Sequence, residues 1–274
     1  MPIKYAARTS ILSKQWRKLW STQPHLVFDS LFFGYVSNIV GASPASIIHK
    51  ILMQHIGPIL GFHLISKLHE LSQSDFDQCI IFVSNHGIEK FTLDVSNVEK
   101  DALPCSIFTC SMLTHLKALE LEHSELDGQV GSIDLILPML DTLELRFCVG
   151  VDCVNIVSPN LVNLSILSSC TVTFQCFNVN PIFERIKHLC LDGPSLKNLG
   201  SFPVLDMLDV SLNLQHLKIY DLKISVKRIS SAICLLQSSP NLRDLDMDEV
   251  VKVDDEKVSH RTELILICRR HKTK

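Results

Sequence analysis

The sequence lacks the features of a membrane protein or a secreted protein. No stretch approaches about 18 consecutive apolar residues, the length expected of a membrane-spanning helix. Residues 1–10 contain no apolar run of the length found in signal peptides. We therefore expect a soluble protein of the cytoplasm, the nucleus or both.

The sequence also lacks recognisable catalytic and metal-binding motifs. No glycine-rich turn could cradle a phosphate, and no spacing fixes a nucleophile beside a base. Cys-x-x-Cys and His-x-x-x-His pairs, which would indicate a zinc site, do not occur. A hydrolase on another α/β fold would need a concave pocket with convergent titratable groups. We predict that the protein is not an enzyme and has no catalytic residues, metal site or cofactor.

The net charge is low, and the spacing of the cysteines does not indicate a set of disulfides. Charged residues make up 20% of the chain and the net charge is -3, so neither nucleic acid nor a membrane surface is an expected partner. The ten cysteines are spread along the chain without a secretory signal, which favours reduced thiols. Cys148, Cys190 and Cys234 lie within apolar segments, where we expect buried small hydrophobic side chains.

What the sequence does contain is a leucine-rich pattern that recurs through most of its length. Residues 140–148, Leu-Asp-Thr-Leu-Glu-Leu-Arg-Phe-Cys, have the spacing L-x-x-L-x-L-x-x-C. Intervals between successive copies, 21 to 29 residues, match those of leucine-rich repeats. The other copies are Ile59/Phe62/Leu64, Ile88/Phe91/Leu93, Leu116/Leu119/Leu121, Leu161/Leu164/Ile166, Ile186/Leu189/Leu191, Leu214/Leu217/Ile219 and Leu242/Leu245/Met247.

This spacing predicts an α/β leucine-rich-repeat solenoid, a horseshoe with a ladder of parallel strands on its concave side. The second and third apolar positions are two residues apart, so on a strand both point toward the core. One copy cannot bury its apolar side alone, and neighbouring copies must therefore stack. One register stays open, because Leu113/Leu116/Ala118 fits the pattern as well as Leu116/Leu119/Leu121.

The N-terminal stretch combines apolar residues at helical spacing with four basic residues. Residues 6–20 read Ala-Ala-Arg-Thr-Ser-Ile-Leu-Ser-Lys-Gln-Trp-Arg-Lys-Leu-Trp. Such an amphipathic basic helix could serve a membrane surface, a calmodulin-like partner or plain packing. The run resembles the second half of the F-box of plant F-box/leucine-rich-repeat proteins, A-A-R-T-S-x-L-S-K-x-W-R-x-L-W. Pro2 and Ile3 also resemble the Leu-Pro-Ile that precedes this run in the family.

The resemblance implies a ubiquitin-ligase role. In the family, the F-box docks on the Skp adaptor of a cullin ligase. Here the residues that would bind the adaptor are Pro2, Ile3, Ala7, Leu12, Trp16 and Leu19. The first F-box helix of the family has no counterpart in this sequence, so we expect an F-box truncated on its N-terminal side.

Later segments resemble the same family in the same order. Residues 24–30 resemble its first capping strand, and Ser43-Pro44 begins a predicted helix that Gly57-Pro58 ends. A strand near 59–65 and a helix near 75–84, closed by Gly87, follow. Residues 235–247 resemble the start of the family's C-terminal FBD segment. The predicted organisation is a partial F-box at 1–22, a capping strand and helix at 23–56, repeats at 57–251 and a solvated tail at 252–274.

Polar residues between the leucines should face outward on the concave side, the surface that repeat proteins use for partners. They are Lys90, Thr92, Asp94, Glu120, Glu122, Thr142, Glu144, Arg146, Asn163, Ser165, Leu167, His188, Cys190, Asp192, His216, Lys218, Tyr220, Asp244, Asp246 and Asp248. His188 and His216 occupy the same slot of adjacent repeats. Acidic residues dominate both ends of the series, which favours a partner with exposed basic residues. The predicted target-binding residues are Glu120, Glu122, Glu144, Arg146, His188, His216, Lys218, Tyr220, Asp244 and Asp246.

Together these patterns predict a subunit that recognises a protein target through the concave face for a Skp-cullin-F-box ubiquitin ligase. The alternative is a repeat scaffold or decoy that holds partners without coupling to the ligase. Recovery of a Skp adaptor with the chain would separate the two.

Overall fold

A computed structural model shows two compact units, residues 1–127 and 128–274, which we describe separately. The structure describes residues 20–38, 41, 43–67, 71–96, 102–103, 113, 115–122, 125–126, 132–148, 153–167, 185–199, 211–221 and 226–247. The six predicted adaptor-binding residues and the predicted tail lie outside these ranges.

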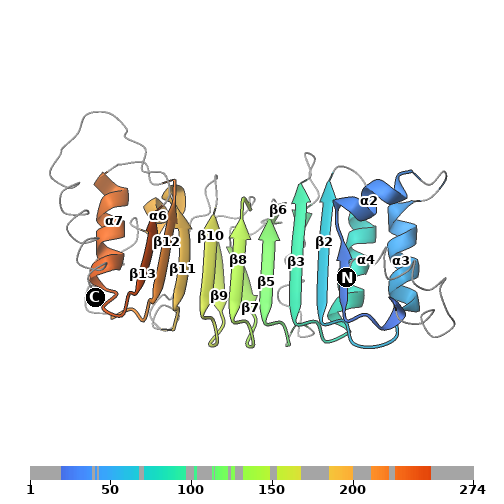
Figure 1. Cartoon of the computed structure of the whole chain (residues 1–274), viewed down its shortest axis with the longest axis horizontal. Coiled ribbons are helices and arrows are strands. Elements are labelled where there is room, and N and C mark those ends of the chain that lie inside the picture. Colours follow the sequence, from blue (N-terminus) through green and yellow to red (C-terminus); the bar gives the residue numbers. More distant parts are fainter. Residues whose placement is uncertain are drawn as a thin grey trace. The chain divides into compact units, whose positions relative to one another are not determined.

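In the first unit, four parallel strands form a ladder: β1 (His25–Phe28), β2 (Gly61–Lys67), β3 (Lys90–Ser96) and β5 (Ala118–Glu122) (Figure 1). Equivalent residues pair across it, so Phe62 lies opposite Leu26 and Phe91, and Phe91 opposite Leu119. The rings of Phe62 and Phe91 stack with centroids 5.8 Å apart. Two further short strands, β4 (Ala102–Leu103) and β6 (Glu125–Leu126), pair separately.

The helices of the first unit begin where the sequence supplies caps. After the short 3-10 helix η2 (Trp20–Thr22), α2 (Ser30–Val36) begins at Asp29, whose carboxylate accepts from the Phe32 amide. Pro44 opens α3 (Pro44–Gln54). Ser72 and Asp75 form a capping box at the start of α4 (Gln73–Ser84), which packs against α3. Gly87 follows α4 with φ +70, a conformation that glycine adopts without strain.

In the second unit, a ladder of five parallel strands contains β8 (Thr142–Arg146), β10 (Asn163–Leu167), β11 (His188–Asp192), β12 (His216–Tyr220) and β13 (Asp244–Met247). Two strands that precede β8 and β10 in the chain, β7 (Ser132–Ile136) and β9 (Cys153–Val157), form a separate parallel pair. The helix α6 (Gly193–Leu199) packs against β10, β11 and α7 (Val226–Gln237). No helix in the described part of the chain is long and apolar enough to cross a bilayer.

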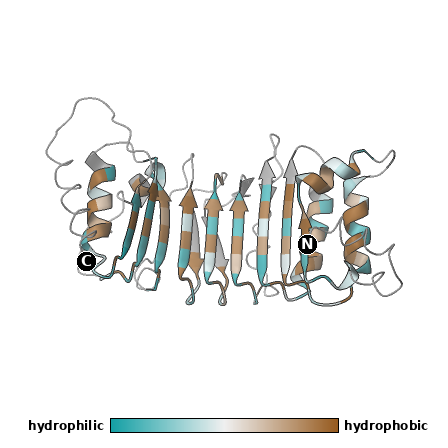
Figure 2. Ribbon diagram, in the orientation of Figure 1, coloured by the Kyte–Doolittle hydropathy of each residue, from teal (hydrophilic) through white to brown (hydrophobic). Residues whose placement is uncertain are grey.

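The apolar positions of the repeat form the core, as predicted. The first position of every copy, from Ile59 to Leu242, is at most 7% exposed. Polar and apolar residues alternate along the ladder strands (Figure 2). The last copy differs, because Leu245 and Met247 are only half-buried; β13 is the last strand of the described residues. The open parallel strands with one buried apolar set per coil confirm the predicted leucine-rich-repeat fold class.

A repeated hydrogen bond fixes the register of each coil. The carbonyl oxygen of Asp141 accepts from the amides of both Val162 and Asn163, and Gln215 O accepts from both Arg243 and Asp244. Such shared acceptors satisfy the amides at the entry of each strand. The Ser-Pro-Asn motifs form turns as predicted, and the buried Ser158 hydroxyl donates to Leu140 O.

The structure settles the register that the sequence left open: Leu119 pairs with Phe91, so the predicted Leu116/Leu119/Leu121 frame is the one present. One helix boundary needs correction. The helix α3 ends at Gln54, because the amide of Ile56 instead donates to Ser21 O, and Ile56 is 62% exposed.

Two further corrections concern the burial of single side chains. Asp192 was predicted to face outward, but it is 9% exposed and its carboxylate accepts from the Ser195 amide, since the chain turns directly into α6. Cys148 is buried as predicted, whereas Cys190 and Cys234 are half-buried. The four described cysteines, the fourth being Cys79, are free. The predicted domain boundaries at 22, 56 and 251 stay predictions.

Candidate functional site

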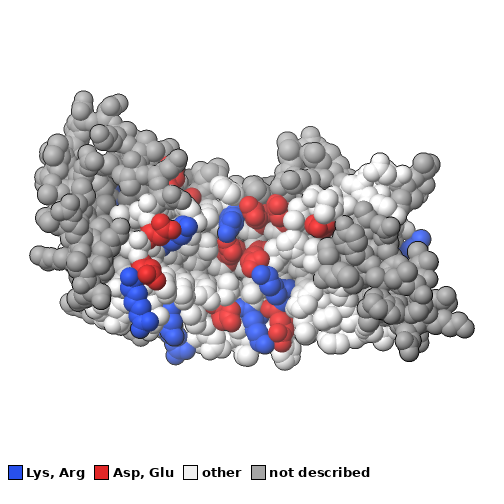
Figure 3. Space-filling view, in the orientation of Figure 1, with Lys and Arg blue, Asp and Glu red and all other residues white. Residues whose placement is uncertain are grey.

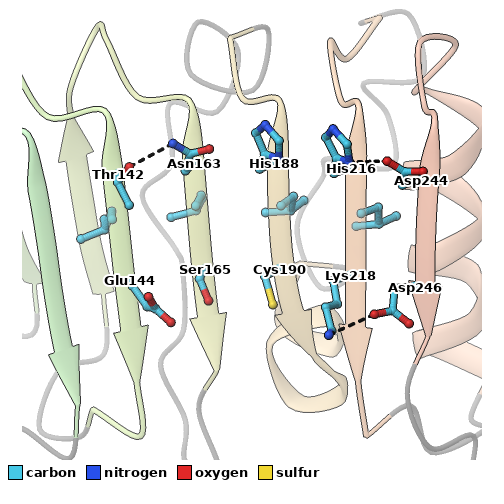
Figure 4. Close-up of a pocket in the computed structure, with 14 residues that line it drawn as sticks. Thr142, Glu144, Asn163, Ser165, His188, Cys190, His216, Lys218, Asp244 and Asp246 are labelled. Carbon is cyan, nitrogen blue, oxygen red and sulfur yellow. Dashed lines mark hydrogen bonds and ion pairs between the residues drawn. The ribbon is translucent and has the colours of Figure 1, made fainter.

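The outward side of the second ladder contains a shallow hollow of about 380 Å³. Each of the five ladder strands, β8, β10, β11, β12 and β13, contributes side chains to it, because the register places equivalent positions beside one another. Two rows of polar side chains border the hollow (Figure 4). The first row is Thr142, Asn163, His188, His216 and Asp244, and the second row is Glu144, Ser165, Cys190, Lys218 and Asp246.

The first row is joined by contacts at its two ends. On one side, the Asn163 amide nitrogen donates to Thr142 Oγ1 at 2.9 Å. On the other side, His216 Nδ1 lies 2.7 Å from Asp244 Oδ2. The rings of His188 and His216 are nearly parallel, 5° apart, with centroids at 4.3 Å. The predicted side-by-side arrangement of the two histidines is therefore confirmed.

The second row contains ion pairs. Arg146 donates to Glu144 Oε1 through Nε and also approaches that oxygen with Nη2. Lys218 Nζ lies 3.0 Å from Asp246 Oδ2 and 4.6 Å from the centre of the Tyr220 ring. Hydrogen bonds to Tyr220 and then to Asp246 raise the pKa of Lys218, so this amine stays charged.

Two other titratable groups of the hollow, His188 and Cys190, favour their neutral forms. Desolvation lowers the pKa of His188, and the neighbouring His216 and Lys187 lower it further. Burial raises the pKa of the Cys190 thiol, against a smaller opposing effect of its hydrogen bond with Ser165. A thiol with a raised pKa is a poor nucleophile. Among the described residues, no group of three or more His, Cys, Asp or Glu could hold a metal ion. The hollow is therefore built for hydrogen bonding.

Six of the predicted target-binding residues line this hollow: Glu144, His188, His216, Lys218, Asp244 and Asp246. Arg146 and Tyr220 do not line the hollow, but they contact the lining residues Glu144 and Lys218, respectively. Glu120 and Glu122 belong to the first unit, where Glu120 binds Lys90 Nζ at 2.6 Å and Thr92 Oγ1 at 2.9 Å. Whether any of these residues binds a target stays a prediction.

The predicted site set omitted the neutral members of both rows. Thr142, Asn163, Ser165 and Cys190 line the hollow but were only predicted to face outward. Their signal was available in the sequence, because they occupy the same repeat positions as the charged residues that were chosen. Selection by charge therefore missed these four uncharged side chains.

The surface charges compensate one another more than the sequence suggested. On the face seen in Figure 3, described acidic and basic side chains adjoin instead of forming a patch of one sign. Glu89 pairs with Lys117 at 3.0 Å, in the same way as the pairs described above. The expectation of a basic partner stays a prediction, but Glu120, Glu144 and Asp246, on which it relied, already have cationic neighbours.

The buried leucine frame and the parallel ladders define a leucine-rich-repeat protein. Comparison with known proteins narrows the class. The chain is 31% identical over 259 residues to the F-box/FBD/LRR-repeat protein At4g13965 of Arabidopsis thaliana, which covers 90% of this chain and 54% of that protein. It is 35% identical over 129 residues to the F-box/FBD/LRR-repeat protein At1g13570 of the same plant, covering 46% and 30%. The FBD-associated F-box protein At5g38590 is 28% identical over 256 residues, covering 90% and 57%.

These matches confirm the predicted resemblance, and the chain is a relative of the plant F-box/LRR-repeat proteins. It spans about half the length, or less, of these relatives. No family model matches the sequence, and no solved structure matches it significantly.

Proposed function

We propose that this chain acts as a substrate-recognition subunit of a Skp-cullin-F-box ubiquitin ligase, holding a protein target on the outward face of its repeats. Its relationship to F-box/LRR-repeat proteins supports the ligase connection. The hollow on the second ladder, bordered by two rows of polar side chains, supports target binding by this face. The chain itself would perform no chemical step, and it would work in the cytoplasm, the nucleus or both.

The ligase connection is tested by co-expression with a Skp-type adaptor and affinity capture of the tagged chain. We expect recovery of the adaptor, and loss of the adaptor in a variant that carries Leu12→Ala and Trp16→Ala. The matched control is Lys50→Ala, on the exposed side of α3, which should retain the adaptor. Far-ultraviolet circular dichroism of each variant confirms that the repeats are folded.

A negative result has a definite meaning. If the folded wild-type chain recovers no adaptor, the ligase role is wrong and the chain is a repeat scaffold that holds partners without delivering them to ubiquitin transfer. If the adaptor is recovered equally with the double variant, the predicted adaptor-binding residues are wrong.

A further inference from the structure

The chemistry of the hollow allows a narrower statement about its occupant, which rests on the proposed target-binding role. Among the described residues, the hollow exposes no large hydrophobic side chain on which a partner could anchor. The leucines at its floor, Leu143, Leu164, Leu189 and Leu217, are at most 2% exposed, since they belong to the core. None of the large hydrophobic residues that the structure shows as exposed lines the hollow. A partner that relied on an aromatic or aliphatic hot spot would find no exposed large hydrophobic side chain of the described residues to pack against there.

Charge attraction is also weak, because the formal charges of the hollow are compensated. Glu144 pairs with Arg146 and Asp246 pairs with Lys218, while Asp244 contacts His216. Counting histidines as uncharged, these groups carry a formal net charge of -1. Asp244 and Asp246 have side chains 70% and 62% exposed, so water and salt screen them. A basic partner would have to compete with cations already in place.

Neutral hydrogen-bonding groups occupy the middle of the hollow. The side-chain nitrogen of Asn163 donates to Thr142 Oγ1. The side-chain oxygen of Asn163 accepts no hydrogen bond from the described residues. His188 is exposed and stacks on His216, but its ring nitrogens have no hydrogen-bond partner among the described residues. Both side chains stand in the first row, between Thr142 and His216 (Figure 4). They offer an acceptor from Asn163 and one donor with one acceptor from neutral His188.

The dimensions of the hollow fit an extended chain. Five adjacent strands span about 19 Å at their usual spacing, a distance that about six extended residues cover. The two rows lie two residues apart along each strand, which is about 7 Å. We propose that the hollow binds an extended, uncharged polar segment of a target protein, laid across β8 to β13 between the two rows, with Asn163 and His188 as its main hydrogen-bonding contacts.

The test is selection of phage-displayed random peptides of about seven residues on the immobilised full chain. We expect the enriched peptides to be near-neutral and rich in Asn, Gln, Ser and Thr. Asn163→Ala and His188→Ala should each weaken binding of a synthesised enriched peptide about three- to tenfold. His188→Gln, which keeps neutral donors and acceptors, should retain more affinity than His188→Ala. Raising the salt concentration from 50 to 500 mM should change the affinity less than about twofold.

The matched control is Gln237→Ala, which removes an amide from the exposed side of α7 outside the hollow and should bind like the wild type. Thermal unfolding checks that every variant is folded. Enriched peptides with two or more Lys or Arg, weakened by salt and by Asp244→Asn or Asp246→Asn, would overturn the inference while leaving target recognition by this face intact. Failure to enrich any peptide that depends on Asn163 or His188 would also overturn it. Adaptor recovery is independent of all these outcomes.

Discussion

Leucine-to-alanine replacement should cost very different amounts in the middle and at the end of the second ladder. Leu189 is 2% exposed and pairs with Leu164 on one side and Leu217 on the other. Leu245 has the same repeat position but is half-buried, and it pairs with Leu217. Because a buried leucine loses both transfer free energy and cavity contacts, Leu189→Ala should lower the free energy of unfolding by about 3–4 kcal/mol. Leu245→Ala should lower it by about 1–2 kcal/mol.

Urea unfolding followed by circular dichroism measures both values. Lys187→Ala, exposed and adjacent to β11, serves as the surface control and should stay within about 0.5 kcal/mol of the wild type. The m-value should change little, since neither replacement alters the surface exposed on unfolding by much. Equal losses at the two leucines would refute the reasoning, because they would show that burial and neighbouring coils do not set the contribution of each repeat.

Three other replacements probe local features of the fold. Ser72→Ala removes the capping box of α4 and should cost about 1 kcal/mol, measured by thermal unfolding. Gly193→Ala should destabilise the protein, since its Cβ would clash with the carbonyl oxygen of Asp221. Gly34→Ala, at a position on α2 with open space around it, should be neutral or stabilising. Burial lowers the pKa of His55 from 6.5, so its contribution to stability should be present above pH 6.5 and lost as the pH falls, because the unfolded chain then binds more protons. His55→Gln should reduce this loss between pH 7.5 and 5.5; an unchanged pH profile would contradict it.

The repeat frame was predictable because one physical requirement recurs. Each coil must bury its first, second and third apolar positions against its neighbours, and the spacing of Leu140, Leu143 and Leu145 records that requirement directly. The predicted pairing of His188 with His216 followed from the same frame. A side chain could therefore be assigned to a strand position, and to a neighbour on the next strand, from the sequence alone.

The repeat pattern could not predict which groups the polar side chains contact. Asp192 has an outward repeat position, yet its carboxylate turns to the amide of Ser195 because a helix begins at the next residue. The acidic residues looked like an open negative surface in the sequence. Their pairing with Arg146 and Lys218 depends on which side chains reach one another across and along the strands, and the repeat pattern carries no such information.

On the second ladder, the buried leucine positions stabilise the fold, whereas the outward polar positions are free to differ. Leucine positions are held by neighbours on both sides, so a change at Leu189 alters the coil itself. The outward positions touch mainly one another and water, and Asn163→Ala or His188→Ala should leave the coil intact. Specificity can therefore change from one repeat protein to the next without loss of the fold. For this chain, the neutral centre between compensated ion pairs makes hydrogen-bond matching, and not net charge, the property by which a target would be distinguished.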